Sequence, residues 1–355
     1  MQIKNTSKYL FQQLSKKLRK TIAGLSISET DKWCSFHQSG GKKFAYFLLA
    51  KRKPKIDVWC IGNPEYIKSK YSTNIKFATR QKTTGGFGKS FQIHFLIEDQ
   101  EDIEKAFPLL SEVSNSWSKE ELMLAFNLYC KIPISQIDQY NKNIIEFASL
   151  LGKTPKDIVK RFLNFSKLEA STNSLGNIEG FEDRETWAGF HNNWEKSIYE
   201  SESHIIDLEY KNQGNTEFPK GKERQIILES RVNQGFFRSI VLSSYDNKCC
   251  ITQLPFTELL NASHIIPWAI DPEIRLNPHN GLCLNALHDR AFDRGLITIT
   301  PNYIIKISPY ISDLLDDVTV SDLFIRYQNQ KIFLPDRFTP EKLFLEYHNK
   351  KVFKK

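Results

Sequence analysis

Long hydrophobic runs are missing from this sequence. The longest is FAYFLLA at 44–50, far below the roughly 20 residues that a membrane span requires. The N-terminal residues MQIKNTSKYL lack the apolar core of a signal peptide. These absences exclude a membrane-spanning protein, and we expect a cytoplasmic one.

Cysteine is scarce: the chain has six in 355 residues and no CxxC pair. Disulfides are rare in a reducing cytoplasm, and structural zinc sites usually contain CxxC pairs. Cys249, Cys250 and Cys283 come closest to a zinc ribbon, but no fourth cysteine lies nearby. We therefore expect small buried thiols rather than disulfides or structural zinc.

The composition that is present is that of a folded protein. Hydrophobic residues make up 40% of the chain and aromatic residues 12%, which is enough buried surface to offset chain entropy and excludes general disorder. Single cores rarely grow past roughly 250 residues. The length therefore predicts two or three domains.

Positive charge is concentrated near the N-terminus. Residues 1–100 contain 19 Lys and Arg against 6 Asp and Glu, whereas the remaining residues contain 30 against 35. A block this basic favours a polyanion, above all nucleic acid, because neutralising phosphates releases counterions. A solvated lysine-rich surface is the alternative.

The N-terminal block has mixed helix and strand patterns. Leu10, Leu14 and Leu18 recur every four residues and predict a helix over 4–24. A second helix is expected over 102–113. Short apolar runs between them predict strands at 44–50, 55–62, 75–80 and 90–97. We expect a small basic α+β domain over 1–115.

This domain could recognise DNA or a modified base. Lys51, Arg52 and Lys53 lie in a predicted loop, where their side chains can reach phosphates. Its aromatic residues could line a pocket for an extruded base, or they could pack the core. These residues are Trp33, Phe36, Tyr46, Trp59, Tyr66 and Tyr71.

Residues 116–206 have helical patterns. Thr154, followed by Pro155 and Asp157, is a strong helix start. Short helices with a basic last helix are typical of helix-turn-helix DNA-binding domains, and an ordinary helical bundle is the alternative. The predicted DNA contacts of this adaptor domain are Lys156, Lys160 and Arg161. A linker is expected at 207–224.

Three polar residues follow in order within the C-terminal part: His264 in SHIIPW, Asn280 in NPHNGLCL and His288 in ALHDRAFDRG. This arrangement resembles the HNH endonucleases, whose ββα-metal fold presents a histidine from a strand, an asparagine from a loop and a histidine from a helix. The resemblance covers roughly 225–310, and the segment ahead of it is similar to a restriction-type subgroup.

The resemblance implies a role for each residue. His264 would be the general base, Asn280 would hold the loop and the base, and His288 would bind a divalent cation, Mg²⁺ or Mn²⁺. Ser263 stands where many members have an acid or a second histidine, so Asp293 or Asp289 would supply a further ligand, and we favour Asp293. The step from Asn280 to His288 is also one residue shorter than the commoner nine.

The predicted fold is therefore α+β and multidomain, with a C-terminal ββα-metal HNH nuclease domain and its extension at 225–355. The predicted function is a metal-dependent DNA endonuclease of restriction or anti-phage defence type, acting on double-stranded, possibly modified, DNA and plausibly as a homodimer. Arg238 would grip DNA or brace the nuclease. A nuclease activated by a small nucleotide and a non-catalytic DNA-binding protein with a degenerate HNH domain are the alternatives.

Overall fold

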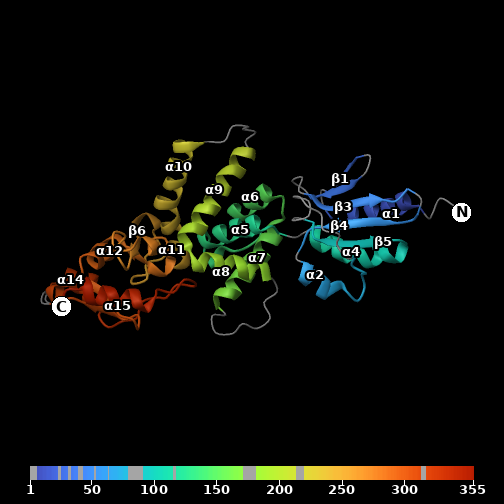
Figure 1. The fold of residues 1–355 in the computed structure, drawn as a ribbon. Helices are drawn as coiled ribbons and strands as arrows, with labels where there is room; N and C mark the ends of the chain where they lie inside the picture. The colour runs from blue at the N-terminus through green and yellow to red at the C-terminus, as the bar shows by residue number, and fades with distance from the viewer. Residues whose placement is uncertain are drawn as a thin grey trace. The chain divides into compact units, whose positions relative to one another are not determined.

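The structure is a computed structural model of the chain, shown as a ribbon in Figure 1. It describes residues 6–22, 25–30, 33–38, 43–51, 53–62, 64–78, 91–114, 117–170, 181–212, 220–312 and 317–355. The chain forms two compact units: an N-terminal unit of Met1–Ser118 with Leu151–Lys153, and a C-terminal unit of Lys119–Leu150 with Thr154–Lys355.

The N-terminal unit is an antiparallel sheet with helices, as the α+β prediction requires. Its five strands pair in chain order, β1 to β5, each antiparallel to the next. The elements are α1 (Ser7–Thr21), β1 (Ser26–Glu29), β2 (Cys34–His37), β3 (Lys43–Leu49), β4 (Ile56–Cys60), α2 (Pro64–Tyr71), β5 (Ile93–Ile97) and α4 (Gln100–Ser114).

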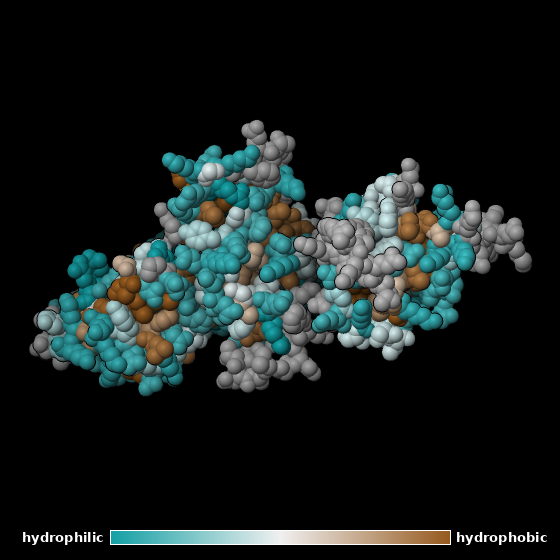
Figure 2. Space-filling model, viewed as in Figure 1, coloured by the Kyte–Doolittle hydropathy of each residue, from teal (hydrophilic) through white to brown (hydrophobic). Residues whose placement is uncertain are grey.

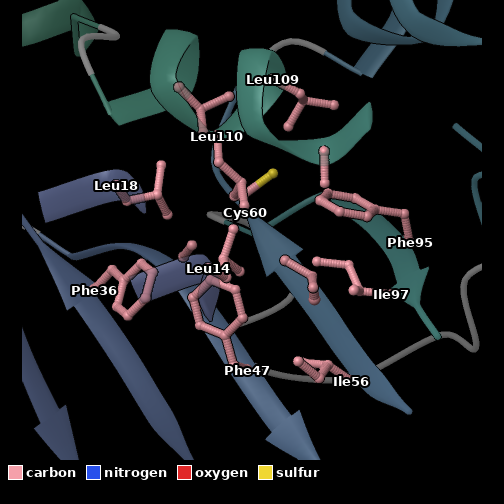
Figure 3. Close-up of a cluster of buried hydrophobic side chains, with 14 of the residues drawn as sticks. Leu14, Leu18, Phe36, Phe47, Ile56, Cys60, Phe95, Ile97, Leu109 and Leu110 are labelled. Atoms are coloured by element: carbon pink, nitrogen blue, oxygen red, sulfur yellow. The ribbon is translucent and has the colours of Figure 1, made fainter. Parts of the chain in front are cut away.

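One face of this sheet carries the core. Strands β4 and β5 alternate buried and half-buried residues, so every second side chain points to the same face. Leu14 and Leu18 from α1 and Leu109 and Leu110 from α4 pack there against Phe47 and its neighbours (Figure 3). The four-residue spacing of the α1 leucines therefore builds the buried stripe that the sequence predicted.

One prediction for this unit needs correction, and three elements were not predicted. The expected strand at 75–80 is only an isolated bridge between Phe77 and Phe95 in the described residues. The sequence reading also missed β1 and β2, which have four residues each, and α2. Short strands have few alternating positions, so their pattern is weak in a single sequence.

The C-terminal unit begins with helices that pack around α5. Helix α5 contacts α7, α8, α9 and α11, and Phe126 and Tyr129 on it are fully buried. The helices are α5 (Lys119–Lys131), α6 (Lys142–Leu151), α7 (Pro155–Ala170), α8 (Phe181–Asn192), α9 (Trp194–Asn212), α10 (Gly221–Ser230) and α11 (Phe237–Ser244). A π-helical turn at Arg231–Phe236 joins α10 to α11.

The predicted start of α7 has the expected geometry. The Thr154 hydroxyl accepts from the Asp157 amide at 3.2 Å, and the Asp157 carboxylate accepts from the Thr154 amide at 3.2 Å. This reciprocal pair satisfies two amides that have no partner inside the helix.

Helix α5 also shares buried polar contacts with residues 225–355, the part of the chain whose start resembles HNH endonucleases. The Ser243 hydroxyl on α11 donates to the Cys130 carbonyl at 2.6 Å, and the buried Arg337 donates to the same carbonyl at 3.1 Å. Part of the predicted linker is helical, since α9 reaches Asn212 and α10 begins at Gly221. The domain boundaries themselves stay predictions.

The rest of the C-terminal unit, which follows α11, is built on a short antiparallel hairpin. Its elements are β6 (Leu260–His264), β7 (Gly281–Asn285), α12 (Ala286–Asp293), β8 (Ile297–Ile299), β9 (Ile305–Ile307), α13 (Pro309–Ser312), α14 (Val318–Leu323) and α15 (Lys342–Lys351). Strand β6 pairs with β7, and β8 pairs with β9. Helix α15 packs on β8, so the C-terminal extension belongs to this fold.

The surface is mostly hydrophilic on the face that Figure 2 shows, with hydrophobic residues in separate patches. Scattered exposed apolar residues are ordinary for folded proteins. Among the helices of the described residues, none has the length and apolar character to cross a membrane.

Candidate nuclease site

The β6–β7 hairpin lies between two helices. Helices α11 and α12 each contact both strands. Because side chains alternate along a strand, Asn261 and Ser263 face α12, where both contact Asp289, whereas His264 faces α11, where its ring stacks on Phe237. The hairpin therefore carries polar groups on both faces, and Ser263 and His264 are neighbours at the end of β6.

His264 is the last residue of β6, three residues before Pro267. Its ring stacks on Phe237 with centroids 3.9 Å apart and meets Trp268 edge-on at 5.5 Å. The Nε2 atom donates to the Arg275 carbonyl at 2.9 Å. A carbonyl only accepts, so in the neutral ring the lone pair lies on Nδ1, which makes no hydrogen bond within the described part of the chain.

The electrostatics of His264 favour the neutral ring. Burial lowers its pKa from the ordinary value, and the hydrogen bond to Arg275 opposes this only in part. A neutral imidazole with a free lone pair can take a proton. His264 can therefore act as a general base at neutral pH.

Asn280 is fully buried and joins the two ends of the loop. Its Oδ1 accepts from the Ile266 amide at 2.8 Å, and its Nδ2 donates to the Ile266 carbonyl at 3.1 Å. Its own carbonyl accepts from the Ile265 amide at 2.9 Å. The side chain thus holds the backbone just after His264, while the ring itself is held by Arg275, Phe237 and Trp268.

His288 lies on α12 but is an internal residue, 3% exposed. Its Nδ1 accepts from the Asn285 amide group at 3.1 Å, and its Nε2 donates to the Leu323 carbonyl at 2.7 Å. The Cys249 thiol lies beside it: burial acts to raise the pKa of Cys249, but the neighbouring His288 and Thr252 lower it to about 7. Both ring nitrogens are therefore occupied by the protein.

Two carboxylates lie on α12 one turn apart. Asp289 accepts from Asn261 at 2.7 Å and from the Ser263 hydroxyl. Asp293 is exposed, and its pKa is raised first by partial burial and then by the charge of Asp289. Like charges that disfavour each other in this way are relieved by a cation between them.

Asp289 and Asp293 fit a hard cation better than the predicted ligands, His288 and Asp293, do. Ligation by His288 would break its bond to Leu323, whereas Asp289 and Asp293 offer oxygen atoms. Mg²⁺ is commonly held by one or two carboxylates and retains several waters. Among the described residues, no group of three or more His, Cys, Asp or Glu is placed to hold a metal, so water would have to fill the remaining positions.

Asp289 is better placed than its second rank among the predicted ligands suggested. A nine-residue step from Asn280 ends on Asp289 rather than on His288, and Asp289 is the side chain that meets Ser263. The eight-residue step from Asn280 to His288, one shorter than the commoner nine, therefore already pointed to Asp289.

Two of the arginines predicted to bind DNA are used internally. Arg238 donates to the carbonyls of Leu260 at 2.6 Å and Thr257 at 2.8 Å, so it braces the start of β6. Arg161 donates to both carboxylate oxygens of Asp183, at 3.0 and 2.9 Å, and Asp183 is fully buried. Both bonds come from Nη1 of Arg161, and this ion pair holds α7 to α8.

The lysines predicted to contact DNA, unlike these two arginines, are exposed to solvent. Lys156 and Lys160 are exposed on α7, and Lys51 and Lys53 are exposed on the N-terminal unit. Arg52 lies outside the described residues. Contact of these lysines with DNA stays a prediction.

The six cysteines of the chain are all free and buried. Cys249, Cys250 and Cys283 lie around β7, where Cys250 donates its amide to the Cys283 carbonyl at 2.7 Å. Burial raises the pKa of Cys283 to about 12, so this thiol stays protonated at neutral pH.

Comparison with protein families matches residues 249–300 to the HNH endonuclease model. A comparison with curated proteins finds no match. The matched segment includes the β6–β7 hairpin, the loop with Asn280 and helix α12. HNH endonucleases are nucleases that act on DNA and generally use a divalent metal. The chain therefore carries an HNH endonuclease domain at residues 249–300.

Proposed function

We propose that this chain is a metal-dependent DNA endonuclease of a restriction or anti-phage defence system, in which the N-terminal unit selects the DNA that the C-terminal unit cuts. The observation that carries the proposal is His264 at the end of β6, whose Nδ1 has no hydrogen bond among the described residues and whose loop is held by Asn280. HNH sites contact mainly the DNA backbone, so selection needs a second unit.

In the proposed reaction, Nδ1 of His264 accepts the proton of the attacking water. The stacked Phe237 ring and the Arg275 carbonyl hold the imidazole in one orientation. Asp289 and Asp293 would hold the divalent cation, which neutralises charge developing on the phosphate. Cleavage would leave 5′-phosphate and 3′-hydroxyl ends.

Plasmid cleavage tests this proposal. We expect nicked or linear DNA with Mg²⁺ or Mn²⁺ and none with EDTA. His264→Ala should lower the rate by roughly 10²–10⁴-fold, because a positioned base contributes that much. The control is His204→Ala, which changes an exposed histidine on α9 and should leave the rate unchanged. Retained cleavage by His264→Ala would refute the base assignment.

The pH profile gives a second test. Only neutral His264 accepts a proton, and burial lowers its pKa. Cleavage should therefore rise with pH through a midpoint below the ordinary histidine value of about 6.5. A midpoint above that value would contradict the neutral, buried base.

A further inference from the structure

The N-terminal sheet has a second face that the core does not use. Strand pairing aligns one residue from each strand in a row across this face. The residues before and after each of them in the strand point to the other face of the sheet. The row, named here the outer row, is Ser28, Ser35, Tyr46, Trp59 and His94.

The outer row changes from hydroxyl groups at β1 to rings at β5. The hydroxyls of Ser28 and Ser35 are 2.8 Å apart, and His37 Nε2 lies 2.9 Å from Ser28 and 3.1 Å from Ser35. At the other end, Trp59 and His94 stack with centroids 4.3 Å apart and planes within 6°. Hydrogen-bonding groups and flat rings thus share one surface.

The aromatic residues that the sequence singled out divide between the two faces. Phe36 and Tyr71 belong to the core cluster, whereas Trp33, Tyr46 and Trp59 do not. Trp33 packs edge-on against Tyr46 at 6.3 Å and Trp59 at 5.2 Å. The side chain of Tyr66 lies outside the described residues. Core packing therefore accounts for Phe36 and Tyr71, and a role in a pocket stays open for Trp33, Tyr46 and Trp59.

A cavity of about 340 Å³ opens at the hydroxyl end of the outer row. Its lining combines aromatic rings, hydroxyls and one cation: Ser28, Thr30, Trp33, Ser35, Lys43 and Tyr46. The exposed Lys43 ammonium lies 5.4 Å from the Tyr46 ring centre. This volume is near the lower end of ligand pockets, which span roughly 300–1,000 Å³, so it suits one small ligand.

We infer that this cavity binds one unpaired nucleotide of DNA, with the base against Trp33 and Tyr46 and the phosphate near Lys43. Rings stack bases, hydroxyls bond base edges, and an ammonium attracts phosphate. The surrounding excess of Lys and Arg over residues 1–100 matches a polyanion. The inference rests on the proposed function because it takes DNA as the substrate that the N-terminal unit selects.

Binding measured without cleavage tests the inference separately from the nuclease. The full chain is titrated in EDTA against short fluorescent duplexes, either fully paired or with one unpaired base, and gels check that the DNA stays intact. We expect about tenfold tighter binding of the duplex with the unpaired base, since base–aromatic stacking has roughly that effect. This preference can be present whether or not the chain cuts DNA.

Matched variants locate the site. Tyr46→Ala should abolish the preference for the unpaired base and leave binding of paired DNA unchanged. Tyr9→Ala is its control, on helix α1. Lys43→Gln should weaken both duplexes and lower the salt slope of log K by about one, whereas Lys8→Gln, exposed on α1, should affect the two duplexes equally and keep the preference. Near-ultraviolet circular dichroism checks that each variant is folded.

Two outcomes would overturn the inference. Folded Tyr46→Ala with an undiminished preference would place the base elsewhere. Mononucleotides that bind at this cavity more tightly than the duplex with the unpaired base would make free nucleotide, rather than DNA, its ligand.

Discussion

The N-terminal sheet and the β6–β7 hairpin differ in how many of their faces are packed against helices. Helices α1 and α4 contribute to a core on one face of the N-terminal sheet, and the other face presents the outer row. The hairpin has helices on both faces, and its polar groups lie at strand ends, in the loop and against α12. A covered hairpin can hold a few groups rigidly, whereas a broad face can offer a recognition surface.

The largest effect that we expect is a loss of metal affinity and activity when Asp289, on the α12 side of the hairpin, is changed. Asp289→Asn keeps the shape of the side chain but removes its charge. Loss of a group that holds or orients a metal typically costs about 10–100-fold in metal affinity or activity. We expect that loss in Mn²⁺ binding by calorimetry and in plasmid cleavage.

Asp322→Asn, on the exposed surface of α14, is the matched control and should change neither quantity. His288→Gln provides the contrast. It should lower the free energy of unfolding by about 1–3 kcal/mol, because it disturbs buried hydrogen bonds, while Mn²⁺ affinity persists. If His288→Gln abolishes Mn²⁺ binding and Asp289→Asn does not, the metal belongs to His288 after all.

A second prediction concerns packing on the α11 side. At Gly281, the strand partner of His264, an added Cβ would meet the Val241 side chain, and it would lie 3.2 Å from the Phe237 ring and from the Pro278 carbonyl oxygen. Gly281→Ala should therefore lower the free energy of unfolding by about 1–3 kcal/mol, the usual cost of overpacking. Urea denaturation measures it.

The same measurement on the N-terminal sheet should give a smaller change. Ser28 is exposed at the end of the outer row, and Ser28→Ala should stay within about 0.5 kcal/mol, as most surface substitutions do. Equal destabilisation by the two variants would contradict the contrast between a hairpin covered on both faces and a sheet whose outer row ends at the exposed Ser28.

The last prediction is a pH dependence set by His348 on α15. Its ring stacks on Phe292 at 3.7 Å, and its nitrogens contact Thr298 and the Phe292 carbonyl. Burial lowers the pKa of His348 from 6.5 to about 4. The unfolded chain then binds the proton first, so stability falls as the pH drops from 6.5 toward 4.

This loss is at most about 1.4 kcal/mol per pH unit. Urea unfolding of the C-terminal unit at pH 7 and pH 5 measures it, and His348→Gln should flatten the dependence. An unchanged slope in that variant would assign the effect to other groups.

Local patterns predicted several parts of this molecule well. The leucine spacing of α1 and the cap of α7 depend on near neighbours in the chain, and both appear in the structure. The short strands β1 and β2 and the internal bonds of Arg161 and Arg238 could not be predicted, because their partners lie on other elements.

The sequence by itself determined that the chain is folded, that its positive charge lies near the N-terminus, and that its C-terminal segment has the order of residues typical of HNH endonucleases. Only the tertiary structure decided which side chains face one another. Asp289 contacts Ser263, whereas His288 is buried and bonds Leu323. Phe36 belongs to the core cluster, whereas Tyr46 and Trp59 do not. Adjacent residues of a helix or strand point in different directions, so a shift of one position exchanges a buried group for one in the site.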